Sequence, residues 1–290
     1  KPDYAEAHNN LGMALGMQGK TDQAVTHLRQ AIALQPNFVA AHNNLGNALS
    51  MQGETDQAVA HFERALALQP GAAAHNNLGL MLAAQGKTDQ AVAHFERALA
   101  LKPDFAEAHY NLGSALALHG RIDQAVTHYE RALALNPDFA EAHNNLGLAL
   151  AAQGRMDRAV AHFERALALK ADYVEAHYNL GSVLVLQGKT DRAVAHFERA
   201  LALKPGHAEA HYNLGNALAL QGETDQALTH YERALALKSD DTVAHNGLLF
   251  ILNYLSDKNP EAVYVAHLDF ARRWEAPLAK FIQPHSNDRS

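Results

Sequence analysis

The stretch Ala106–Phe139, AEAHYNLGSALALHGRIDQAVTHYERALALNPDF, contains one complete structural unit. A first helix is expected to end near Gly120, because glycine readily adopts the left-handed conformation that terminates helices. Asp123 then places a carboxylate near the positive end of a second helix, whose apolar face includes Tyr129. Pro137 closes the unit, since proline cannot continue a helix. The stretch therefore predicts two helices joined by a tight turn.

Histidines mark the period of this pattern along the chain. Successive members are 34 residues apart, except for one step of 33 at Gly71 and Ala72, where a junction residue is missing. The row comprises His8, His42, His75, His109, His143, His177, His211 and His245. A fixed period of this length is typical of a repeat protein. We predict seven units, at 5–38, 39–71, 72–105, 106–139, 140–173, 174–207 and 208–241, in a region spanning 1–241. Residues 242–290 are expected to form a degenerate eighth first helix and a connector helix.

Glycine recurs in the middle of each first helix, where it costs about 1 kcal/mol relative to alanine. The row comprises Gly12, Gly46, Gly79, Gly113, Gly147, Gly181 and Gly215. Seven glycines in one phase indicate that a neighbouring helix packs closely there. Alanines such as Ala24 and Ala58 are expected to face this row.

The first unit contains a characteristic set of residues: Leu11, Gly12, Leu15, Gly19, Ala24, Leu28, Ala31 and Pro36. This set resembles the tetratricopeptide repeat, and later units match it with Phe or Tyr at the Leu28 position. The resemblance implies an all-α fold, a right-handed superhelical solenoid of helical hairpins with a pair of non-repeat helices at the C-terminal end. It also implies a long groove lined by the first helices, a surface that suits protein partners.

Composition excludes several functional classes. The net charge is −7 and basic residues are spread singly, so we expect no nucleic-acid partner. No apolar run approaches the roughly 20 residues that span a bilayer, so no membrane association is expected. The absence of cysteine fits a reducing compartment, and we expect a cytoplasmic location. The chain opens at Lys1 in mid-pattern, so we expect it to be an excerpt.

No catalytic constellation emerges from the sequence. Of 18 glycines, 14 belong to the mid-helix row or to a row of turn glycines, so no phosphate-binding loop can be assembled. Of 19 histidines, 15 belong to the His8 row or to a second row that begins at His27. Within these two rows, no two histidines have the i, i+4 spacing that converges on a metal. We therefore expect no catalytic residue, no metal and no cofactor in this chain, and the hypothesis that it is itself an enzyme is disfavoured.

Asparagine occupies one position of every first helix, two residues after the histidine: Asn10, Asn44, Asn77, Asn111, Asn145, Asn179 and Asn213. Asparagine is a mediocre helix former, so the row needs a reason. One interpretation is a hydrogen bond between repeats that supports the stack. The other is an asparagine ladder along the groove, because an amide can both donate to and accept from a peptide backbone. Tyr110, Tyr178 and Tyr212, beside this row, would add apolar surface with a polar tip. We assign the peptide-binding groove to these ten residues.

Glutamates in the first turn of five first helices also have two interpretations. They compensate the helix dipole, or they form an acidic groove edge that favours basic partners. The residues are Glu6, Glu107, Glu141, Glu175 and Glu209. A clamp for chaperone C-terminal carboxylates is disfavoured, because the groove-side rows of this chain carry Asn, Tyr and Glu where such clamps carry Lys and Arg.

The end of the chain departs from the repeat. Gly247 replaces the ladder asparagine, and the helix around Leu248–Tyr254 is apolar almost all round, which indicates cover on several sides. Because such surfaces associate when left open, we expect self-association through the ends or the tail, with Phe250 and Leu252 taking part. Pro260 opens a further helix.

This tail resembles the segment that joins repeats to catalytic lobes in the O-GlcNAc transferase and SPINDLY glycosyltransferase family. The resemblance rests on Leu248–Tyr254, on the opening at Asp257–Glu261 and on Ala271–Trp274, and the asparagine ladder is also a feature of that family. It implies a parent enzyme that transfers a sugar, usually N-acetylglucosamine from UDP-GlcNAc, to Ser or Thr of proteins; SPINDLY-like relatives use GDP-fucose. The two Rossmann-like lobes would follow Ser290. This chain would then recruit extended segments of substrate or adaptor proteins, and the alternative is a stand-alone adaptor scaffold.

Overall fold

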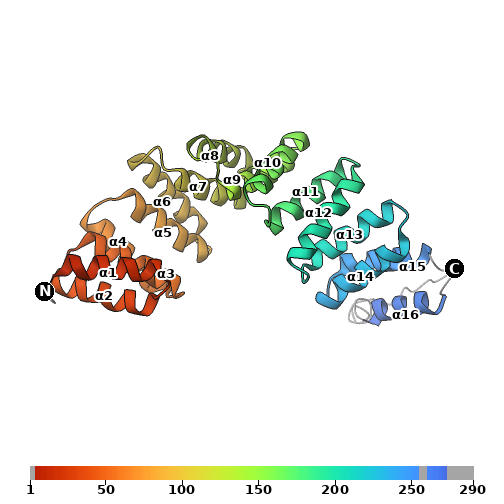
Figure 1. The fold of residues 1–290 in the computed structure, drawn as a ribbon, viewed down its shortest axis with the longest axis horizontal. Helices are drawn as coiled ribbons and strands as arrows, with labels where there is room; N and C mark the ends of the chain where they lie inside the picture. Colours follow the sequence, from red (N-terminus) through yellow and green to blue (C-terminus); the bar gives the residue numbers. More distant parts are fainter. Residues whose placement is uncertain (1–3, 255–259, 273–290) are drawn as a thin grey trace, which may run out of the picture. The chain divides into compact units, whose positions relative to one another are not determined.

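The computed structural model describes residues 4–254 and 260–272, and every regular element in these ranges is helical (Figure 1). The first helices of the repeats are α1 (Ala5–Met17), α3 (Val39–Met51), α5 (Ala72–Ala84), α7 (Ala106–Leu118), α9 (Ala140–Ala152), α11 (Val174–Leu186), α13 (Ala208–Leu220) and α15 (Thr242–Tyr254). The second helices are α2 (Thr21–Leu34), α4 (Thr55–Leu68), α6 (Thr88–Leu101), α8 (Ile122–Leu135), α10 (Met156–Leu169), α12 (Thr190–Leu203) and α14 (Thr224–Leu237). The last helix is α16 (Pro260–Phe270). The predicted all-helical class is confirmed.

The chain divides into two compact units, residues 1–155 and residues 156–290. Unit 1 contains α1–α9 and unit 2 contains α10–α16. Within each unit, every helix packs on its neighbours in sequence, and consecutive first helices also touch, as α1 and α3 do in unit 1 and α11 and α13 in unit 2. This is the nearest-neighbour packing of a helical repeat array.

The turn between the two helices of a hairpin depends on glycine. At Gly120 the backbone φ is +71°, a conformation that side chains with a Cβ rarely adopt. The Arg121 N–H then donates to the Leu116 carbonyl at 2.9 Å, and the Gly120 N–H to the Ala117 carbonyl at 3.0 Å. These bonds satisfy the last carbonyls of α7 as a Schellman motif does. The predicted helix stop near Gly120 is confirmed, two residues after the helix itself ends.

The mid-helix glycines make room for a large side chain of the second helix. A Cβ added at Gly46 would lie 2.7 Å from the Phe62 ring, which is only 1% exposed. In the first repeat Leu28 fills the same place against Gly12, and in the fourth repeat Tyr129 lies against Gly113. The predicted close approach is therefore confirmed, and it is chiefly a ring on a glycine rather than backbone on backbone.

The eighth first helix, α15, ends the repeat. Leu249, Ile251 and Leu252 are buried, whereas the Phe250 side chain is 67% exposed. The expectation that Leu252 is open for association is therefore wrong, because its position on α15 directs its side chain toward the neighbouring helices. The ring of Phe270 in α16 lies edge-on to His245, with ring centroids 5.4 Å apart.

Two parts of the tail that were singled out in the sequence, Asp257 with its neighbours and Trp274, lie outside the described residues. Among the described helices, none combines the length and the hydrophobicity needed to cross a membrane.

Candidate functional site

The asparagine row lies on one face of the first helices. Each member is the sixth residue of its helix, so successive asparagines repeat at the spacing of the hairpins. Asn10 is exposed and the other six are half-buried. Unit 1 contributes Asn10, Asn44, Asn77, Asn111 and Asn145, and unit 2 contributes Asn179 and Asn213. Within each unit the amides therefore recur at one position of the stack, as predicted.

Hydrogen bonds join these amides to the preceding repeat. Asn44 donates to the Asn9 Oδ1 at 2.9 Å, and Asn111 donates to the Asn76 Oδ1 at 2.9 Å. The Asn77 amide reaches the Asn47 Oδ1 instead, at 2.8 Å. Each bond crosses from one first helix to the previous one. The interpretation that the row supports the stack therefore has a structural basis.

The ladder keeps bonding capacity beyond these contacts. An asparagine amide offers two N–H donors and an oxygen with two lone pairs. In the bonds just described, each ladder amide uses one N–H. The oxygens of Asn10, Asn77 and Asn145 accept a second bond, from the asparagine immediately before each in its own helix, at 3.1–3.3 Å. At least one donor and one lone pair thus remain on Asn44, Asn77 and Asn111, so the bonds within the stack do not exhaust the row.

The tyrosines beside the row are tied to it. The Tyr110 hydroxyl accepts from the Asn145 amide at 3.2 Å, and the Tyr178 hydroxyl accepts from Asn213 at 3.0 Å. Burial raises the pKa of both phenols, so they remain neutral near pH 7. Their polar tips are therefore already engaged, and what they offer a partner is chiefly ring surface. The Tyr212 ring packs 5.8 Å from that of Tyr231.

Large apolar side chains share this face, and the sequence interpretation missed them. They stand three or seven residues after the ladder position, which places them on the same side of the helix. Met17 is 84% exposed and Leu118 is 81% exposed. The exposed set comprises Met13, Met17, Met51, Leu80, Leu118, Leu148, Leu186, Leu220 and Phe250. The i+3 and i+7 spacing from the asparagine was the signal that could have found them.

Shallow cavities lie between consecutive first helices, beside the ladder. One of about 460 Å³ between α7 and α9 is lined by Tyr110, Leu118, Asn145 and Leu148. Cavities of about 320 and 210 Å³ lie between α1 and α3 and between α3 and α5. Amide groups and apolar surface thus alternate along the first helices of unit 1.

A larger cavity, about 750 Å³, lies between α13 and α15 in unit 2. Its lining includes Tyr212, Leu220, Tyr231, Gly247 and Phe250. Gly247 takes the ladder position there, and a Cβ on it would meet the Tyr231 ring at 2.7 Å. The row of amides therefore gives way to an apolar hollow at this point.

The acidic row is only partly available. The Glu209 carboxylate lies 3.3 Å from the His207 Nδ1 and 3.9 Å from the Lys238 Nζ, and Glu6 accepts a bond from the Tyr4 hydroxyl. All five glutamates stand in the first turn of their helices, where dipole compensation operates. Among the described residues, no group of three or more His, Cys, Asp or Glu gathers as a metal site.

Stacked two-helix hairpins with a polar and apolar face on their first helices define a helical-repeat protein. The chain belongs to the tetratricopeptide repeat family: models of this repeat match residues 9–73 and 178–242, 79–120 and 113–154, and 138–206. Together these matches cover 9–73 and 79–242. A search of curated protein sequences found no match.

Solved structures show the same fold. YrrB, a TPR protein described as having an unusual peptide-binding site, is 25% identical with a TM-score of 0.55, over 64% of this chain and 96% of YrrB. MamA is 27% identical with a TM-score of 0.52, over 56% of this chain and 95% of MamA. PilF of Pseudomonas aeruginosa is 20% identical with a TM-score of 0.66, over 72% of this chain and 95% of PilF, and shows the fold alone.

Proposed function

We propose that the first-helix face captures extended polypeptide segments by their backbone. The observation that carries this proposal is the row of amides in which Asn44, Asn77 and Asn111 keep a donor and an acceptor after bonding to the preceding repeat. An extended peptide presents N–H and C=O groups whatever its side chains, so such a row fits many sequences. The peptide-binding site named for YrrB supports a similar use of this fold.

The apolar cavities add a preference to this capture. A segment that lies along the amides of unit 1 would place some of its side chains beside Leu118 and Leu148. Aliphatic or aromatic residues would bury surface there at about 25 cal/mol per Å². The preferred partner is therefore an unfolded segment with occasional large apolar residues.

The expected affinity is weak. A net hydrogen bond contributes about 0.5–1.5 kcal/mol, so the five amides of unit 1 would supply roughly 3–7 kcal/mol. Ordering the peptide consumes much of this. Dissociation constants should fall in the micromolar to millimolar range, with rapid release.

Two variants distinguish peptide capture from support of the stack. Replacing Asn111 and Asn145 by Ala removes ladder amides together with their bonds to the preceding repeat. The matched control, Asn76→Ala with Tyr110→Phe, removes the same two bonds from the acceptor side, together with the bond from Asn76 to Asn77, and leaves both ladder amides in place.

Peptide binding to both variants would be measured by fluorescence anisotropy with a labelled extended peptide, and folding by circular dichroism. The ladder variant should bind at least about tenfold more weakly than the control, which corresponds to about 1.4 kcal/mol. Equal losses in both variants would show that the amides act only through the stack.

We propose in addition that the chain is the substrate-recruiting arm of a protein glycosyltransferase resembling the O-GlcNAc transferase and SPINDLY family, working in the cytoplasm. The support is the tail resemblance, of which Leu248–Tyr254 falls within α15, together with the asparagine row. Weak, sequence-tolerant capture suits an enzyme that modifies many proteins. The alternative is a stand-alone adaptor scaffold.

The coding sequence beyond Ser290 decides between these two. Two Rossmann-like lobes with a nucleotide-sugar site are expected for the recruiting arm. A stop codon, or a domain of another class, would favour the scaffold.

A further inference from the structure

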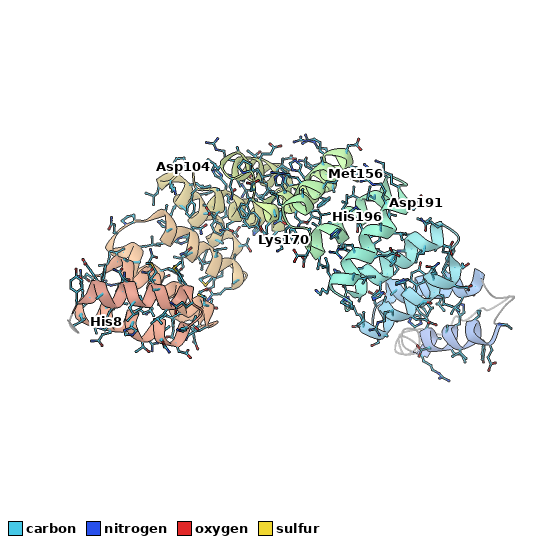
Figure 2. All side chains as sticks on the ribbon, viewed as in Figure 1. His8, Asp104, Met156, Lys170, Asp191 and His196 are labelled. Atoms are coloured by element: carbon cyan, nitrogen blue, oxygen red, sulfur yellow. The ribbon has the colours of Figure 1, made fainter. Side chains whose placement is uncertain are left out.

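In each hairpin whose two helices lie in one unit, two histidine side chains face each other through their Nδ1 atoms. One comes from the His8 row on the first helix and the other from the His27 row on the second helix, with His8 on α1 and His196 on α12 labelled in Figure 2. The two Nδ1 atoms lie 2.9–3.0 Å apart, a hydrogen-bond distance. The described pairs are His8–His27, His42–His61, His75–His94, His109–His128, His177–His196 and His211–His230.

The backbone fixes where the protons are. In the His42–His61 pair, the His42 Nε2 lies 3.0 Å from the Pro36 carbonyl oxygen, which can only accept. The His42 Nε2 must therefore carry a proton, and in the neutral ring the His42 Nδ1 is then a bare acceptor. His61 must donate its own Nδ1–H to it.

The same logic holds for three further pairs, whose first-helix rings donate to the carbonyls of Pro103, Ala171 and Pro205.

Ring geometry indicates a shared proton rather than a chelated metal. The ring centroids are 5.1–5.3 Å apart while the Nδ1 atoms are 2.9–3.0 Å apart, so the two rings lie almost end to end. The two Nδ1 atoms therefore point at each other. Two ligands of one metal ion would instead both point at a common third atom.

The surroundings oppose further protonation. Burial is the main cause that lowers the pKa of nine of these rings, and facing arginines lower it further in all of them except His230. The bonds to the backbone carbonyls of Pro103, Ala171 and Pro205 act in the opposite direction on His109, His177 and His211. In unit 2, Glu164 of α10 acts in the opposite direction on His196. The charged groups that face the pairs are Arg29 in α2, Arg97 in α6, Arg121 just before α8, Arg131 in α8, Arg192 and Arg199 in α12, and Arg233 in α14. His207, just before α13, also faces His211.

We propose that the histidine pairs are acid-sensitive clasps, which hold the two helices of a hairpin together near neutral pH and open when both rings become charged. One added proton can enter at the Nε2 of the second-helix ring, and its Nδ1–H then donates more strongly. A second added proton must take the Nδ1 of the first-helix ring, which already accepts the shared hydrogen. The bond is then lost, and two imidazolium rings face each other about 3 Å apart.

The direction of the pH effect follows from this balance. In the unfolded chain each histidine titrates near pH 6.5. A folded pair accepts about one proton fewer than its two unfolded rings, so stability is full above pH 6.5 and is lost as the pH falls below it. The unfolding equilibrium constant should rise about tenfold per pair for each pH unit. Asp and Glu titrate near pH 4, so the window from 6.5 to 5 belongs to the histidines. Repetition multiplies the effect along the array, and acidification would also loosen the helices that present the asparagine row.

The native chain provides the first test. Urea unfolding at a series of pH values between 8 and 5 gives the number of protons taken up on unfolding. About one proton for each of the five pairs that contain a ring of lowered pKa, about five in total, is expected between pH 6 and 5. Uptake of two or fewer would overturn the proposal. Nitrogen-15 spectra of the rings at pH 8 should also show a bare Nδ1 in His42 and a protonated Nδ1 in His61, and the reverse pattern would contradict the assignment.

A variant isolates the pairs. Replacing the six second-helix histidines by Asn keeps a neutral donor at the position of the imidazole Nδ1 and removes the second titrating ring. The Asn amide can also turn its Oδ1 toward the first-helix ring and accept its Nδ1–H once that ring is protonated, so the folded hairpin can take up this proton without losing the bond. The matched control replaces two histidines outside the pairs, His119 and His267, by Gln. The control should keep the full acid sensitivity, and the Asn variant should lose most of its proton uptake. An acid transition in the Asn variant as steep as in the native chain would show that the clasps are not its cause; should this variant fail to fold, the proton count of the native chain still decides.

Discussion

At the scale of single residues, the glycine rows show how a repeat encodes its own packing. The sequence predicted close packing at Gly46 because glycine is costly inside a helix, and the Phe62 ring occupies that space. Where the asparagine side chains reach could not be predicted, because a bond to Asn9 or to Tyr110 depends on rotamers that the periodicity leaves open. The histidine pairs were missed for a related reason: their partners are 19 residues apart, across the turn, and only the spacing within one helix had been considered.

Substituting Gly46 by Ala should destabilise unit 1. The added Cβ would lie within 3.0 Å of three atoms of the Phe62 ring, and overpacking of this kind costs about 1–3 kcal/mol. Gly206→Ala is the matched control, because nothing lies within 4 Å of its Cβ and its φ is not positive. The control should be neutral or stabilising by about 0.4–1 kcal/mol. Urea unfolding measures both, and equal stabilities of the two variants would argue against the packing role of the row.

At the scale of helices, the sequence predicted the existence of the hairpins well. The turn glycines and the junctions marked the ends of α7 and α8 to within two residues, because each mark has a local physical cause. The prediction was weaker for α15, where the repeat breaks down. An apolar helix was correctly expected to be covered, but which of its faces is covered follows from tertiary packing alone, so Leu252 was assigned to the wrong side.

Two neighbouring substitutions in α15 should therefore differ in effect. Phe250→Ser changes an exposed ring and should leave the free energy of unfolding within about 0.5 kcal/mol. Leu252→Ser empties a buried position and should cost about 2–5 kcal/mol. If the exposed apolar surface drives self-association, Phe250→Ser should also lower the apparent mass measured by light scattering at high concentration. A native chain that stays monomeric at all concentrations would contradict the association.

At the scale of the whole molecule, we propose a recognition surface on the first helices and expect no nucleotide site in this chain. Fourteen of its 18 glycines belong to the turn row or to the mid-helix row, so we expect no loop of backbone N–H groups that binds phosphates. Calorimetric titration of this chain with UDP-GlcNAc should therefore give no saturable heat up to millimolar concentrations. Saturable binding would contradict this and would require a site that neither the sequence pattern nor the described helices reveal.

The account rests on recognition of a peptide backbone by the asparagine row, and backbone methylation tests this most directly. Three extended peptides would be titrated against the native chain: one sequence, a shuffled version of it, and the first sequence with alternate backbone nitrogens methylated. Methylation removes N–H donors and leaves the side chains in place. We predict similar dissociation constants for the first two peptides and binding at least about tenfold weaker for the methylated one, since the loss of three hydrogen bonds at about 0.5–1.5 kcal/mol each suffices. Equal binding of the methylated peptide, or loss of binding on shuffling, would contradict it.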